Sequence, residues 1–259
     1  MANETLFTTK ATSYAKGRPS YAPGAIGRIL DCLAMGGYQP AADGPWARIA
    51  DIGSGTGILS RELIGRNLEV YGVEPNEAMR EKAEHQLGTC GHFHSVAASA
   101  ESTGLPDHSM AMVTAASAFH WFDPEAFRRE CLRILVPGGL VCLLINVREY
   151  DDFTRRQHEL CRKYGAGFTS LIHGFEETKE KAAVFFEEGF HLERFDFPLT
   201  YEKEAFISRS LSSSYAPEAG SENGRLYMEG LQRLLEEIPQ ERFTVANFTA
   251  LFWGKPCAL

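Results

Sequence analysis

Two acids and three glycines at the ends of two predicted strands form the part of this sequence best suited to chemistry. Asp51 closes an apolar run, and Gly53, Gly55 and Gly57 follow it at alternate positions. Glycine tolerates positive φ and lacks a Cβ, so the backbone of such a turn can approach a ligand closely before a helix begins. The helix is expected over residues 58–66. The turn is therefore predicted to be a ligand-binding site.

The spacing of these residues favours a cationic ligand that brings no phosphate to the turn. A dinucleotide-binding turn has its third glycine three residues after the second, and Ile58 holds that position here. Asp51 would repel a phosphate and would suit an ammonium or a hydroxyl group. Glu74 ends the next apolar run, where a carboxylate can bridge two ribose hydroxyls. Together these residues predict an adenosine that carries a charged amino-acid tail.

This combination resembles motif I and the acidic position after it in class I S-adenosylmethionine-dependent methyltransferases of the type 11 domain family. Three more segments resemble the family's adenine-binding segment, its fourth motif and the turn into its fifth strand: residues 96–106, 115–123 and 132–140. The similarity covers roughly residues 10–147. Residues 13–21 and 119–123 are most similar to the small-molecule subgroup that includes trans-aconitate methyltransferase.

The resemblance implies a fold, a cofactor and a set of binding residues. The implied fold is α/β: a doubly wound, mainly parallel seven-stranded sheet with helices on both faces and a helical lid inserted in the C-terminal part. The implied cofactor is S-adenosyl-L-methionine, with S-adenosyl-L-homocysteine as the product. The residues expected to bind it are Tyr14, Arg18, Asp51, Gly53, Ser54, Gly55, Gly57, Glu74, Pro75, Met79, Ser99, Ala100, Glu101 and Ser117.

A second group of residues is expected at the methyl acceptor. A sulfonium already activates its methyl group, so the protein mainly aligns donor and acceptor and excludes water. His120 could take a proton from an acceptor hydroxyl, although shaping the wall of the site is the simpler role and a carboxylate acceptor would need no base. Tyr14 is the other catalytic candidate, through cation–π attraction to the sulfonium. Tyr21, Trp121 and Arg148 are expected to contact the substrate.

The apolar pattern divides the chain into three regions. Residues 1–21 are polar with scattered aromatics, which predicts an arm over the active site. Residues 22–147 alternate apolar and amphipathic runs, as is typical of a parallel sheet with helices, and form the cofactor-binding core. Residues 148–259 are expected to complete the sheet and to carry the helical substrate lid. Asn76 and Asp123 are expected to cap helices. The strands expected in the core are 46–51, 69–74, 92–97, 110–116 and 139–147.

Composition limits the partners. The formal charge of −8 over 259 residues argues against a nucleic-acid substrate, because phosphate binding needs a basic surface. The six cysteines form no Cys-x-x-Cys pair, and Cys90, His92 and His94 lack further residues at ligand spacing, so no metal is expected. Residues 1–4 show no basic region followed by an apolar stretch, and no run approaches membrane-spanning length, so neither a secretory leader nor a membrane span is expected. We therefore expect a cytoplasmic monomer or homodimer with a small-molecule substrate and no membrane partner.

Three functions are compatible with these residues. The favoured one is transfer of a methyl group from S-adenosylmethionine to a small organic acceptor, with a carboxylate as one option. A non-catalytic sensor or partner subunit could bind the same cofactor and fill the acceptor space with its own side chains. A nicotinamide-dependent oxidoreductase is disfavoured by Ile58, which stands where that fold needs glycine.

Overall fold

The computed structural model describes residues 19–40, 44–165, 168, 173–186, 189–213, 215–218 and 220–258. Its strands are β1 Arg48–Ile52, β2 Glu69–Val73, β3 Phe93–Val96, β4 Met110–Ala116, β5 Leu135–Arg148, β6 His191–Asp196, β7 Leu199–Glu202, β8 Arg242–Val245 and β9 Asn247–Gly254. Its helices are α3 Pro23–Met35, α4 Ile58–Ile64, α5 Glu77–Leu87, the 3-10 helix η1 Phe119–Trp121, α6 Pro124–Ile134, α7 Asp152–Tyr164, α8 His173–Phe185, α9 Lys203–Leu211 and α10 Glu222–Glu236.

A seven-stranded sheet forms the centre of the fold, in the order β3-β2-β1-β4-β5-β9-β6. The strands from β3 to β5 pair in parallel, and β9 runs antiparallel to both of its neighbours. Because the parallel strands all end at one edge, the loops that follow β1, β2 and β4 meet there. The doubly wound, mainly parallel sheet expected from the sequence is confirmed.

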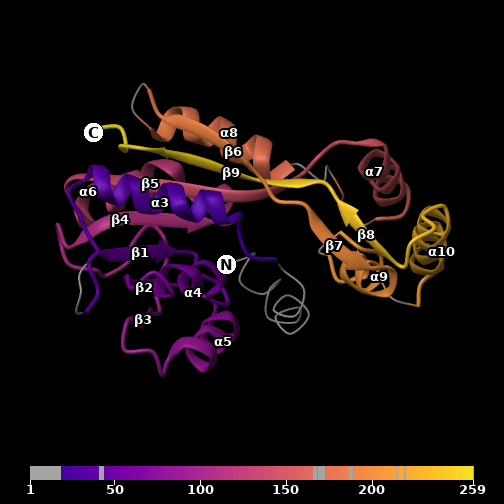
Figure 1. Cartoon of the computed structure of the whole chain (residues 1–259), viewed down its shortest axis with the longest axis horizontal. Helices are drawn as coiled ribbons and strands as arrows, with labels where there is room; N and C mark the ends of the chain where they lie inside the picture. Colours follow the sequence, from indigo (N-terminus) through magenta and orange to yellow (C-terminus); the bar gives the residue numbers. More distant parts are fainter. Residues whose placement is uncertain are drawn as a thin grey trace.

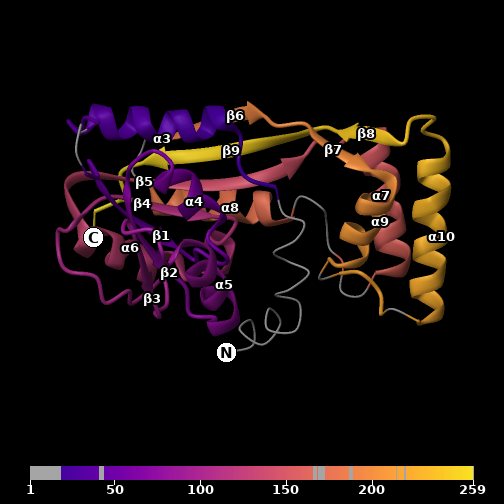
Figure 2. The ribbon, with the colours of Figure 1, turned by 60° about the horizontal axis from the view of Figure 1, so that its bottom comes forward.

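Alternation along the buried strands gives the sheet two apolar faces. In β5, Cys142 and Leu144 belong to the cluster beneath α3 and α4, whereas Leu143 and Ile145 belong to the cluster beneath α6 and α8. Figure 2 shows α3 above the sheet and α8 below it. Both faces are therefore covered, which explains why β4 and the middle of β5 are continuous apolar runs.

A second, smaller cluster lies beyond the end of the sheet. It consists of α7, α9, α10 and the antiparallel pair β7–β8, which we call the small unit and which lies to the right in Figure 1. Its core is built around Phe206, Tyr227, Leu231 and Phe243. The strand β6 leads into β7, and β8 leads into β9, so the small unit is attached through strands that extend from the sheet. The helix α8, which also lies in the region expected to complete the sheet and carry the lid, packs on the sheet.

The packing of α8 makes a prediction about stability. Phe185 is 1% exposed, and its ring stacks on Phe127 with ring centroids 5.4 Å apart. Replacing a buried phenylalanine by alanine leaves a cavity, so Phe185→Ala should lower the free energy of unfolding by about 3–5 kcal/mol in urea denaturation. The control is its neighbour Val184, which is 65% exposed. Val184→Ala should change stability by no more than about 0.5 kcal/mol. Equal effects of the two changes would contradict this packing.

Candidate active site

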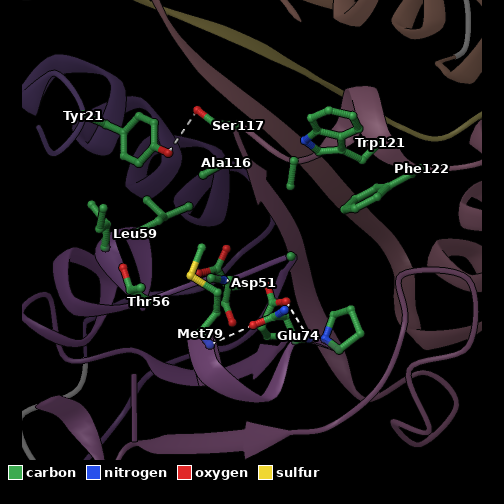
Figure 3. Close-up of a pocket in the computed structure, with 17 residues that line it drawn as sticks. Tyr21, Asp51, Thr56, Leu59, Glu74, Met79, Ala116, Ser117, Trp121 and Phe122 are labelled. Carbon is green, nitrogen blue, oxygen red and sulfur yellow. Dashed lines mark hydrogen bonds between the residues drawn. The ribbon is translucent and has the colours of Figure 1, made fainter. Parts of the chain in front are cut away.

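A cavity of about 180 Å³ lies at the carboxyl edge of β1, β2 and β4. Figure 3 shows the side chains around it, with Asp51 and Glu74 on one side and Tyr21 and Trp121 at opposite ends of the other. Most of the residues predicted from the sequence line this cavity, namely Asp51, Gly53, Ser54, Gly55, Glu74, Pro75, Met79, Ser117, Tyr21 and Trp121.

The glycine turn adopts the backbone that its composition predicts. Gly53, Gly55 and Gly57 have φ values of 66°, 57° and 80°, a region that other residues rarely enter. A Cβ on Gly53 would lie 2.6 Å from Ala118, and one on Gly57 would lie 2.7 Å from Leu87. At Gly55, no atom of the described residues other than its two chain neighbours lies within 4 Å of the added Cβ. Gly53 and Gly57 therefore allow close packing, whereas Gly55 faces the open cavity.

Glu74 joins the turn after β1 to the helix after β2. One oxygen of its carboxylate accepts a hydrogen bond from the Gly55 N–H at 2.9 Å, and the other accepts one from the Asn76 N–H at 2.8 Å. The side chain is 9% exposed. Burial raises the pKa of this carboxyl group, and the two backbone donors oppose the rise. The carboxylate is thus held in one orientation at the floor of the cavity.

Asp51 lies deeper, at the end of β1. It is 1% exposed and accepts hydrogen bonds from the Ser60 hydroxyl at 2.6 Å and from the Thr114 hydroxyl at 3.1 Å. Burial raises the pKa of Asp51 to about 6, against the effect of both hydroxyl groups. Ser60 and Thr114 are partners that the sequence analysis missed. The position of Ser60 in the first turns of α4 was the signal available for it, because that helix starts beside the end of β1.

The loop after β4 forms the opposite wall. The Tyr21 hydroxyl donates to Ser117 Oγ at 3.3 Å. Beyond η1, the Lys181 ammonium of α8 donates to the carbonyl oxygens of His120 at 2.6 Å and Phe122 at 3.2 Å. Lys181 thereby holds the loop that carries Trp121 to the cavity. No local pattern in the sequence connects Lys181 with a loop so far away along the chain.

Several predicted residues lie away from the cavity lining. His120 does not line it, and its ring lies beside Trp121 with ring centroids 4.8 Å apart. Glu101 accepts a hydrogen bond from the Asp123 N–H at 3.2 Å, and Ala100 is buried in the core cluster. Ser99 forms an isolated bridge with a neighbour in its own turn. The roles proposed for these side chains stay predictions.

The remaining predicted residues have different positions. Arg148 at the end of β5 does not line the cavity; it hydrogen-bonds to the side chain of Gln157 and lies over the Phe206 ring, at the base of the small unit. Gly57 begins α4 and shapes the turn from behind. Tyr14 and Arg18 fall outside the described residues.

The described part of the chain contains neither a cluster of metal-ligating side chains nor a membrane-spanning helix. Within it, no three side chains of His, Cys, Asp or Glu gather as they would around a metal ion. His94, one of the residues considered for a metal, lies 3.0 Å from a Glu69 oxygen. No helix among the described residues has both the length and the apolar character needed to cross a bilayer.

A comparison with known families matches the part of the chain that builds the cavity floor. Residues 50–143 match the family model described as methyltransferase domain. This segment is thus similar to methyltransferase domains. It contains the glycine turn, both buried acids and the loop after β4, whereas Tyr21, Arg148 and the small unit lie outside it.

Relatives of the methyltransferase domain agree with this assignment. An uncharacterized methyltransferase of Mycobacterium tuberculosis is 34% identical over 143 residues, which are 55% of this chain and 53% of the relative. A ubiquinone/menaquinone biosynthesis C-methyltransferase of Shewanella sediminis is 28% identical over 132 residues, 48% of this chain and 50% of that protein. The chain therefore spans about half the length of the curated relatives it matches.

A solved structure extends the comparison to nearly the whole fold. A type II methyltransferase candidate from Anaeromyxobacter dehalogenans superposes with a TM-score of 0.64 at 22% identity, and the match covers 92% of this chain and 98% of that one. At this identity the likeness establishes the fold. The narrower resemblance to the trans-aconitate subgroup stays a prediction.

The buried acid Asp51 gives the domain a pH signature. Its pKa is about 6 in the fold against an ordinary value of 3.8, so the folded protein holds this proton more tightly than the unfolded chain. The free energy of unfolding should therefore fall as pH rises from about 4 to 6, by about 3 kcal/mol for this group. Asp51→Asn should remove that fall. Urea denaturation of both ligand-free proteins across this range measures it, and a difference that does not vary with pH would contradict the assignment.

Proposed function

We propose that this protein transfers a methyl group from S-adenosylmethionine to a small organic acceptor. The observation that carries the proposal is the pair of buried acids, Asp51 and Glu74, on either side of a glycine turn inside a methyltransferase domain. The cofactor offers two cationic groups and two ribose hydroxyls, and buried carboxylates complement both kinds of group.

The residues around the cavity fit this cofactor. Each Glu74 oxygen accepts one backbone hydrogen bond, so each keeps a lone pair for a ribose hydroxyl. The open space at Gly55 leaves room for a ligand against the backbone. Pro75 and Met79 supply apolar surface beside Glu74. Burial disfavours the ionised form of Asp51, and a cationic group nearby would stabilise that form.

The chain's own residues then align the reactants and exclude water. When bound, the cofactor supplies an activated methyl group, which moves to a nucleophilic atom of the acceptor while S-adenosylhomocysteine leaves. Asp51 and Glu74 orient one side of the cavity, and Tyr21, Trp121 and Phe122 wall off the other. Displacement of this kind depends on alignment and on a dry site more than on a general base. The position of His120 outside the cavity lining is compatible with such a mechanism.

The open cavity supports an enzyme over a non-catalytic binding protein. A sensor could fill the acceptor space with its own side chains. Here Trp121 borders the cavity and is 53% exposed in the part of the chain that the structure describes. This exposure favours a site that a second molecule can enter beside the cofactor.

Glu74 provides the test of cofactor binding. Calorimetry with S-adenosylhomocysteine should show that Glu74→Ala weakens binding by about 1.5–3 kcal/mol, the scale of hydrogen bonds to a charged group. The matched control is Glu77→Ala, which removes an exposed acid from the first turn of the following helix. The control should bind like the wild type. Equal affinity of Glu74→Ala and the wild type would contradict the assignment of Glu74 to the ribose.

For the acceptor we propose a small anionic molecule such as a carboxylate. An anion entering a protein with a formal charge of −8 needs local positive charge. Arg148 lies where β5 leaves the sheet; it donates to the Gln157 amide oxygen and lies over the Phe206 ring, and among the described residues no carboxylate forms an ion pair with it. A guanidinium without an acidic partner can form charge-assisted hydrogen bonds to a carboxylate, which are roughly twice as strong as neutral ones.

Arg148→Met tests the anionic acceptor. A screen for release of S-adenosylhomocysteine against small carboxylic acids, phenols, quinol-like rings and amines would first identify the best acceptor. For an acid, Arg148→Met should raise KM and leave cofactor affinity unchanged, as expected when substrate binding alone is lost. Arg155→Met, which removes an exposed arginine of α7 paired with Asp152, is the control. A neutral or amine acceptor with a silent Arg148→Met would overturn the anionic acceptor and leave methyl transfer standing.

A further inference from the structure

A pair of polar side chains on β5 and β9 holds the chain on both sides of Tyr21. Asn146 and Thr249 are direct partners in the antiparallel register. The Thr249 hydroxyl donates to Asn146 Oδ1 at 2.6 Å and accepts from the Ala22 N–H at 2.9 Å. The Asn146 amide donates to the Ser20 carbonyl oxygen at 2.8 Å. The residues before and after Tyr21 are thus tied to the same two side chains.

The donor and acceptor roles of Asn146 and Thr249 fix the orientation of both side chains. Thr249 is 0% exposed, and its single hydroxyl proton goes to Asn146, which leaves its oxygen to accept from Ala22. The Asn146 oxygen is therefore directed at Thr249, and its amide group is directed at Ser20. Both side-chain hydrogen bonds that leave the pair end on residues next to Tyr21.

Tyr21 connects this group with the cavity. Its side chain is 8% exposed and lines the same cavity as Asp51 and Glu74. Its hydroxyl donates to Ser117 Oγ, and Ser117 has a φ of 53°, a conformation that is uncommon for residues other than glycine. The Ser117 N–H in turn donates to the Leu144 carbonyl oxygen of β5 at 2.7 Å. Two separate links therefore run from β5 to the wall that Tyr21 and Ser117 form.

We propose that Asn146 and Thr249 are positioning residues for the ligand site, which hold Ser20–Ala22 so that the Tyr21 hydroxyl meets Ser117 at the cavity wall. This inference rests on the proposed function, because it takes S-adenosylmethionine as the ligand of that cavity. Neither side chain lines the cavity. They act through Tyr21, by fixing the backbone from which its ring extends.

A double-mutant cycle with S-adenosylhomocysteine as the probe tests the inference. Thr249→Val keeps the shape of the side chain and removes the hydroxyl, and Tyr21→Phe keeps the ring and removes its hydroxyl. Each change should weaken binding about tenfold in calorimetry. The double variant should be no weaker than the weaker single variant, because residues that act as one unit are not additive. The fitted stoichiometry reports the folded fraction separately from the affinity.

Two further variants distinguish positioning from a general loss of packing. Thr249→Ser retains the hydroxyl and should restore affinity to within about twofold of the wild type. Thr244→Val removes a cross-strand hydroxyl that contacts Thr200 on the solvent-exposed face of the β7–β8 pair, and should leave affinity unchanged. Additive losses in the cycle, or a Thr249→Val variant that binds like the wild type, would overturn the inference. If the wild type itself does not bind S-adenosylhomocysteine, the proposed function fails first, so the two failures are distinguishable.

Discussion

The two hydrogen bonds that backbone N–H groups donate to Glu74 are the interaction on which the arrangement of this site depends. A buried carboxylate is costly unless it is satisfied, and Glu74 is satisfied by Gly55 in the turn after β1 and by Asn76 at the start of α5. The carboxylate can reach both because β1 and β2 are adjacent parallel strands that end together. Gly72 in β2 leaves room for the Phe93 ring of β3 and for Ser54 in the turn after β1, which lie 2.8 Å and 3.1 Å from where a Cβ would be.

The same arrangement works against the stability of the ligand-free protein. Burial raises the pKa of both Asp51 and Glu74, so keeping either group ionised near neutral pH costs free energy. Hydrogen bonds from Ser60, Thr114 and the backbone recover only part of that cost. Two acids with raised pKa values in one cavity are typical of a functional site, because folding alone gives no reason to bury them together. A cationic ligand would offset the remaining free-energy cost of keeping the two carboxylates ionised.

The elements of the core could be predicted from local sequence patterns. The arrangement of the small unit could not, because its strand pairing depends on contacts between segments far apart in the sequence. Asn76 and Asp123 cap α5 and α6 as expected, because an N-cap depends only on the next three residues. The strand β6 ends at Asp196, Pro198 follows it, and β7 then pairs with β8. That pairing joins segments about forty residues apart, which the periodicity of either segment cannot show. The side-chain directions of His120 and Arg148 were beyond prediction for the same reason.

The segment that matches the methyltransferase domain and the rest of the chain contribute different parts of the cavity, and the strands β5 and β9 join them. The match to the methyltransferase domain ends at residue 143, three residues before Asn146 in the same strand. The floor of the cavity thus belongs to the matched segment, whereas Tyr21, the Asn146–Thr249 pair and Arg148 lie outside it. β5 and β9 remain paired as far as Arg148 and Asn247, where the small unit begins, so the strands that hold Ser20 and Ala22 also carry the small unit. Differences between this protein and relatives that share only the domain should therefore concern the wall that Tyr21 forms and the surroundings of Arg148 more than the floor of the cavity.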